Sequence, residues 1–118
     1  MNKYGNELFT GTALYYSRYR PLYPATLIRF LIQRFALDGT GQMLDLGCGD
    51  GRLALRFVDW FERIVGIDQE AEMIQQATHL QQESRFSNIE WFLGDLDNYK
   101  TNHEESFKLV TIAKAFHW

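Results

Sequence analysis

Two short segments of the chain carry residues whose types and spacing could bind a nucleoside. Residues 45–51, Asp-Leu-Gly-Cys-Gly-Asp-Gly, follow an apolar run and contain three glycines. Glycines permit a tight turn and let a ligand approach the backbone without meeting a Cβ. Asp68 ends a second apolar run, 68 − 47 = 21 residues after Gly47. A carboxylate at about this spacing reaches ribose hydroxyls in nucleotide-binding folds, so the two segments predict a nucleoside site.

The acids around the glycines indicate which nucleoside ligand would suit the turn. Dinucleotide binders use the pattern G-x-G-x-x-G, whose helix start meets a pyrophosphate. Here the third glycine comes one residue earlier, and Asp45 and Asp50 lie before and inside the turn. Two carboxylates would repel a pyrophosphate, because like charges repel at a site that otherwise favours anions. The turn therefore favours a ligand with a cationic amino group and a sulfonium, and a nicotinamide-dependent oxidoreductase is the less favoured alternative.

Alternating apolar patterns predict the elements that position these residues. We expect strands near 42–46, 63–67, 89–93 and 107–112. A helix after Pro24, with Pro24 at its N1 position, should precede the first strand, and a helix near 70–83 should separate the second strand from the third. Residues 94–106 give the weakest helix signal. The helix after Pro24 would bury one face, and the glycine turn would lead into another helix. Their inward residues are Leu27, Ile28, Leu31, Ile32 and Phe35 for the first, Leu53, Phe57 and Phe61 for the second, and Met73, Ile74, Ala77 and Leu80 for the helix near 70–83.

This order of elements predicts an α/β fold. Strands that alternate with helices form a parallel sheet with right-handed crossovers, that is, a Rossmann-like open sheet in a three-layer α/β/α arrangement. In the expected order along the sheet, the third strand is followed by the second, the first and the fourth. Residues 1–20 show no clear period and predict an irregular or partly helical arm. We expect an arm at 1–23 and a cofactor-binding domain at 24–118.

With these motifs in order, roughly residues 16–118 resemble the class I S-adenosylmethionine-dependent methyltransferases, in particular the N-terminal half of the type 11, trans-aconitate methyltransferase-like subgroup. Residues 45–51 match the first motif of that family, and Gly-Asp-Leu at 94–96 is similar to the motif after its third strand. The Ala-Phe-His-Trp ending at 115–118 and the segment 16–24 also resemble that subgroup. The resemblance implies methyl transfer from S-adenosylmethionine to a small-molecule acceptor.

The resemblance also implies a set of site residues. Asp68 would hold the ribose hydroxyls, Met73 would lie against the adenine, and Asp95 would accept from the adenine amino group. Tyr19 and Arg20 would lie near the methionine carboxylate, in an arm closing over the pocket. The implied cofactor-binding residues are Asp45, Gly47, Cys48, Gly49, Gly51, Asp68, Gln69, Met73, Asp95, Leu96, Ala113, Tyr19 and Arg20, and the candidate catalytic residue is His117.

Several of these residues have an alternative structural role. Asp68 could cap the helix near 70–83 as well as bind ribose. Asp45 could merely orient the glycine turn, and Cys48 suits a small packing residue better than a nucleophile because no activating base is evident. His117 could be a general base or a packing or substrate contact, since methyl transfer to a carboxylate or thiolate needs no base. The run 15–20, Tyr-Tyr-Ser-Arg-Tyr-Arg, could also stack nucleic-acid bases, although we favour the arm.

Composition limits the classes of partner. The chain has 118 residues, a net charge of −3 and a pI of about 5.5, which fits one soluble domain and argues against dependence on nucleic-acid phosphates. Its only cysteine, Cys48, excludes an intramolecular disulfide and is compatible with a cytoplasmic location. No apolar run suits a membrane span, no signal peptide is evident, and the three histidines show no metal-ligand spacing. We therefore expect no membrane or nucleic-acid partner and no metal.

The resemblance ends with the fourth strand, whereas the family fold normally continues with three more. We expect the domain to be incomplete at its C-terminus and the fourth strand to be an exposed edge through which the chain self-associates. The alternative function is a non-catalytic, truncated module that binds cofactor or dimerises. By itself the chain should bind cofactor weakly and show negligible turnover, because half a pocket holds only one reactant.

Overall fold

The computed structural model describes residues 13–16, 24–102 and 106–112. All its strands belong to one parallel sheet, in the order β1-β5-β2-β3-β4. No helix in these described ranges is long and apolar enough to cross a membrane. Along the chain the elements are β1 (Ala13–Tyr16), α2 (Ala25–Arg34), β2 (Gln42–Leu46), α3 (Arg52–Leu55), β3 (Arg63–Asp68), α4 (Ala71–Ser84), β4 (Ile89–Leu93), α5 (Leu96–Asn102) and β5 (Leu109–Ile112).

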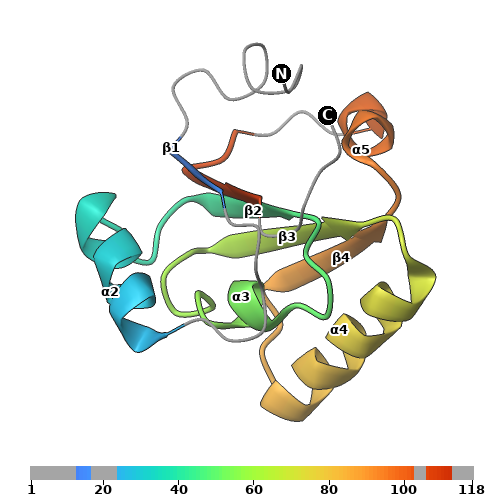
Figure 1. The fold of residues 1–118 in the computed structure, drawn as a ribbon, viewed down its shortest axis with the longest axis horizontal. Coiled ribbons are helices and arrows are strands. Elements are labelled where there is room, and N and C mark those ends of the chain that lie inside the picture. Colours follow the sequence, from blue (N-terminus) through green and yellow to red (C-terminus); the bar gives the residue numbers. More distant parts are fainter. Residues whose placement is uncertain (1–12, 17–23, 103–105, 113–118) are drawn as a thin grey trace.

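Helices cover both faces of the sheet, which confirms the three-layer α/β/α prediction (Figure 1). In the view of Figure 1, α2, α3 and α4 lie below the strands and α5 lies above them. Because side chains alternate along a strand, the sheet supplies two separate hydrophobic cores. The first includes Ile28, Leu31, Met43, Leu53, Phe57, Ile64 and Leu109, and the second includes Leu44, Leu46, Val65, Ile67, Leu96, Tyr99 and Val110.

The order of the four strands predicted from the sequence is confirmed, but the expected exposure of the fourth is not. Residues 13–16, expected in an irregular or partly helical arm, form β1, which pairs in parallel with β5 from Ala13↔Leu109 to Tyr16↔Ile112. The prediction of an exposed fourth strand is therefore wrong within the described residues. β5 lies between β1 and β2. The backbone N–H and C=O groups of β5 that face away from β2 pair with β1, a strand distant in the sequence.

Two helices differ in detail from the sequence prediction. Pro24 precedes α2 as its N-cap rather than occupying the first helical position. The helix after the glycine turn ends at Leu55, so Phe57 and Phe61 lie beyond it, although both are buried in the first core as expected. The weakest predicted helix does form, as α5. Apolar burial was thus predicted more accurately than helix length.

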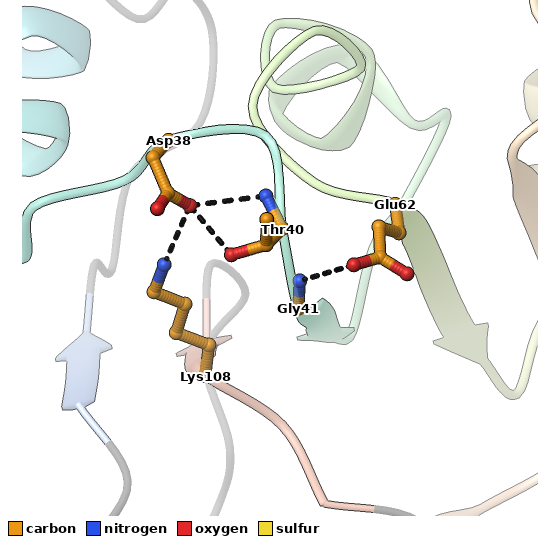
Figure 2. A network of polar contacts seen from close by, with 5 residues as sticks. All are labelled: Asp38, Thr40, Gly41, Glu62 and Lys108. Carbon is orange, nitrogen blue, oxygen red and sulfur yellow. Dashed lines mark hydrogen bonds and ion pairs between the residues drawn. The ribbon is translucent and has the colours of Figure 1, made fainter.

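Polar side chains connect the strands at their amino ends, opposite the glycine turn. Asp38 Oδ1 accepts hydrogen bonds from the Thr40 hydroxyl (2.6 Å), the Thr40 N–H (3.0 Å) and Lys108 Nζ (3.0 Å) (Figure 2). These contacts, those of Thr40 first, hold the pKa of Asp38 well below its usual range. The N–H of Gly41 donates to Glu62 Oε2 over 3.3 Å in the same region. This network fixes the loop before β2 to the start of β5.

Candidate functional site

The glycine turn after β2 is fixed to the neighbouring strand β3. The N–H groups of Gly47 and Cys48 both donate to the Ile67 carbonyl, at 2.8 and 2.9 Å. Gly47, Gly49 and Gly51 have φ values of 67°, 58° and 85°, which L side chains rarely adopt. Three left-handed residues within five positions explain why the turn requires glycines, independent of any ligand.

Asp68 organises the backbone of the predicted site. Its side chain is 5% exposed, at the carboxyl end of β3. Oδ2 accepts from the Gly49 N–H at 2.8 Å, and Oδ1 accepts from the Glu70 N–H at 2.9 Å. The prediction that Asp68 caps the next helix needs correction, because Glu70 is the N-cap of α4 and Asp68 binds the N–H of that residue. One carboxylate thus joins the glycine turn to the start of α4.

The two acids of the glycine turn lie in different environments. Asp45 is completely buried, and its Oδ1 accepts from the Thr111 hydroxyl at 2.8 Å. Asp50 is paired with the exposed Arg52, whose Nε lies 2.7 Å from Asp50 Oδ2. The cation of Arg52 weakens the repulsion that Asp50 would exert on an anion. Asp45 is therefore the main acid expected to disfavour a pyrophosphate at this turn. Cys48 is buried, in agreement with a packing role.

Packing beneath the turn was not predicted from the sequence. An added Cβ at Gly51 would lie 2.5 Å from Trp91 Cη2, and one at Gly66 would lie 2.5 Å from Trp91 Cζ3. The indole N–H donates to Gln81 Oε1 at 2.7 Å, which fixes the ring. The third glycine of the turn and the glycine of β3 therefore both make room for one tryptophan. The only sign of this packing in the sequence was the presence of Trp91 within the predicted strand at 89–93.

The acid after β4 begins a helix. Asp95 Oδ1 accepts from the Asn98 N–H at 2.8 Å, the bond that an N-cap side chain makes to the third residue of a helix. Leu96 is 5% exposed, and its side chain packs in the second core. Met73 on α4 is half-buried, and Gln69 after β3 is exposed. The parallel strands bring Asp45, Asp68 and Asp95 to the same edge of the sheet.

Four predicted site residues, Tyr19, Arg20, Ala113 and His117, lie outside the described residues. Among the described residues, no group of three or more His, Cys, Asp or Glu side chains could hold a metal ion. The geometry in hand is a rigid glycine turn with acids at the carboxyl ends of successive strands, which is where open α/β sheets bind ligands.

Comparison with known proteins decides the family. Residues 43–118 match the methyltransferase domain family. The chain belongs to that family. The match begins within β2 and includes the glycine turn, Asp68 and Asp95.

Individual relatives agree with this assignment. The chain is 28% identical over 105 residues to a probable S-adenosylmethionine-dependent methyltransferase, CRG1, of Saccharomyces cerevisiae. The aligned residues make up 88% of this chain and 36% of the relative. It is 40% identical over 75 residues to a trans-aconitate 2-methyltransferase of Enterobacter, and these residues make up 62% of this chain and 28% of the relative. The chain thus spans about a third of the length of these methyltransferases.

A solved structure agrees in fold. A methyltransferase from Thiobacillus denitrificans in complex with S-adenosylhomocysteine superposes with a TM-score of 0.64 at 23% identity, over 81% of this chain and 38% of that one. This similarity supports the Rossmann-like fold of the methyltransferase domain.

Proposed function

We propose that this chain forms the cofactor-binding part of an S-adenosylmethionine-dependent methyltransferase that acts on a small-molecule acceptor. The observation that carries the proposal is the bridge from Asp68 to Gly49, at 2.8 Å, within a methyltransferase domain. It brings the predicted ribose-binding carboxylate against the turn that would receive the amino-acid part of the cofactor. The cytoplasmic location expected from the sequence stays a prediction.

The described residues fit this cofactor. A carboxylate has about four acceptor positions, and the two backbone donors to Asp68 use one on each oxygen. Capacity remains for the two hydroxyls of a ribose. Asp95 uses one oxygen to cap α5, which leaves the other for the amino group of an adenine. Asp45 places a carboxyl group just before the turn, and its ionised form would attract a cationic amino group.

The bound cofactor would supply a methyl group activated by its sulfonium. The residues of the chain would hold the adenosine across the ends of β2, β3 and β4, and His117 is our proposed general base for acceptors that carry an acidic proton. Positioning and desolvation of the acceptor would supply much of the rate, as in other two-substrate transfers.

Two features support a small-molecule acceptor. The Enterobacter relative, 40% identical, is named for a small carboxylic acid, trans-aconitate. A net charge of −3 disfavours an acceptor held through many phosphates. The alternative is a non-catalytic module that binds cofactor. Self-association through β5 stays a proposal that now requires β1 to be displaced, and light scattering coupled to size exclusion tests it.

Calorimetry with S-adenosylhomocysteine and NAD tests the cofactor. We expect heat from the first ligand only, and an affinity lowered in Asp68→Asn by about 1.5–3 kcal/mol, the range for hydrogen bonds to charged groups. Asp59→Asn is the matched control, because Asp59 is exposed beside the loop at the amino ends of the strands. Binding of NAD without S-adenosylhomocysteine would contradict the proposal, as would equal losses in both variants.

A transfer assay with methyl-labelled S-adenosylmethionine then separates enzyme from module. Small carboxylic acids, amines and phenols are offered in parallel with an RNA oligonucleotide. Labelled small-molecule product supports the proposed acceptor class, and labelled RNA alone refutes it. Tight cofactor binding with no labelled product from any acceptor would favour the non-catalytic module.

A further inference from the structure

A threonine on β5 contacts the acid that precedes the glycine turn. Thr111 Oγ1 lies 2.8 Å from Asp45 Oδ1 and 3.5 Å from the Leu44 carbonyl. Thr111 and Asp45 are direct register partners on the parallel strands β5 and β2, and both are 0% exposed. A hydroxyl has one proton to donate, and its contact with Asp45 at 2.8 Å is much shorter than its contact with the Leu44 carbonyl at 3.5 Å. Thr111 therefore donates to Asp45 and fixes one of its oxygens.

The type of donor matters for what Asp45 can do. A threonine hydroxyl holds a carboxylate oxygen without adding positive charge, whereas a lysine or arginine donor would add a compensating cation. The β-branched side chain of threonine is also stiff about χ1, and burial on close-packed strands restricts it further. In an interior of low dielectric, a fixed carboxylate acts more strongly on a nearby cation than it would in water.

We propose that Thr111 is a positioning residue of the cofactor site, whose hydroxyl orients the Asp45 carboxylate for the cationic amino group of the bound S-adenosyl ligand. This inference rests on the proposed function. Asp45 lies two residues before the first glycine of the turn, so a small rotation of its carboxylate changes the field at the turn. β5 thereby contributes to the site through a residue that itself contacts no ligand.

A purely structural role for Thr111 makes a different prediction. If the hydroxyl only holds β2 and β5 together, its loss weakens every ligand of the site alike. If it orients Asp45, its loss weakens only ligands that carry the amino group. S-Adenosylhomocysteine and 5′-methylthioadenosine separate these cases, because they share the adenosine and the sulfur and only the first has an amino-acid part.

The experiment measures the affinities of both ligands by calorimetry on the 118-residue chain. Thr111→Val keeps the shape and removes the donor, and Thr111→Ser restores the hydroxyl. We expect Thr111→Val to weaken S-adenosylhomocysteine about tenfold, the equivalent of one hydrogen bond to a charged group, and to change methylthioadenosine by less than about twofold. Thr111→Ser should recover most of the lost affinity.

Thr111→Cys provides a second variant if Thr111→Val does not fold, since a thiol is a weaker donor of similar size. It should give a smaller loss, again confined to S-adenosylhomocysteine. Equal losses for both ligands, or no loss for either, would overturn the positioning role and leave the proposed function intact. A wild-type chain that binds neither ligand would instead overturn the proposed function, and this inference with it.

Discussion

Substitution of Gly66 by alanine tests whether Trp91 fixes the geometry beneath the glycine turn. The new Cβ would lie 2.5 and 2.6 Å from Trp91 Cζ3 and Cε3 and 3.1 Å from Cys48 Sγ. Carbon atoms pack at about 3.5–4.0 Å, so the overlap is about 1 Å. The ring cannot withdraw freely, because its N–H is bonded to Gln81 at 2.7 Å.

The expected cost follows from two opposing effects. Overpacking of a rigid core costs about 1–3 kcal/mol, and the fixed ring places this site near the upper value. Replacing glycine by alanine recovers about 0.4–1 kcal/mol by restricting the unfolded chain. We therefore expect Gly66→Ala to lower the free energy of unfolding by about 2 kcal/mol.

Urea denaturation followed by circular dichroism measures this loss, and Trp91→Leu supplies the control. Leucine removes the ring atoms that the new methyl group would meet, so Gly66→Ala in the Trp91→Leu background should cost less than about 0.5 kcal/mol. A loss below about 0.5 kcal/mol in the wild-type background, or an equal loss in both backgrounds, would refute the argument from ring contact.

Three further outcomes are expected at the acids of the structure. Asp68→Asn should lower stability by about 1.5–3 kcal/mol in urea unfolding, because one amide oxygen cannot replace two charged acceptors, and unchanged stability would contradict this. Asp38, whose pKa is held low by Thr40, contributes stability above its unfolded pKa of about 3.9 and loses it as the pH falls through its lower folded value. Urea midpoints from pH 6 to pH 2 should therefore fall less in Asp38→Asn than in wild type, and parallel curves would exclude this role. Asp95→Ala should cost about 0.5–2 kcal/mol by uncapping α5 while Asp95→Asn costs little, and hydrogen exchange at the Asn98 amide should rise in the alanine variant alone.

Local chemistry allowed much of the fold to be predicted. The strands expected at 42–46 and 89–93 have those bounds in the structure, because their apolar runs are interrupted by glycine and polar residues on either side. The acids Asp45, Asp68 and Asp95 were named as residues of one predicted site, and the parallel strands bring them to the same edge of the sheet. These predictions depend only on residues close together in the chain and on the right-handed connection of parallel strands.

Tertiary structure decided the contacts between distant residues. The pairing of β1 with β5 joins residues 13–16 to 109–112, and no local pattern distinguishes such a strand from an irregular arm. Thr111 and Asp45 are 66 positions apart, and Trp91 fills the space left by Gly51 and Gly66. Hydrophobic periodicity determines which face of an element is buried, whereas register and close packing determine which side chains meet there. The sequence by itself therefore determined which acids follow the successive strands, and only the folded chain decided which neighbours hold those acids in place.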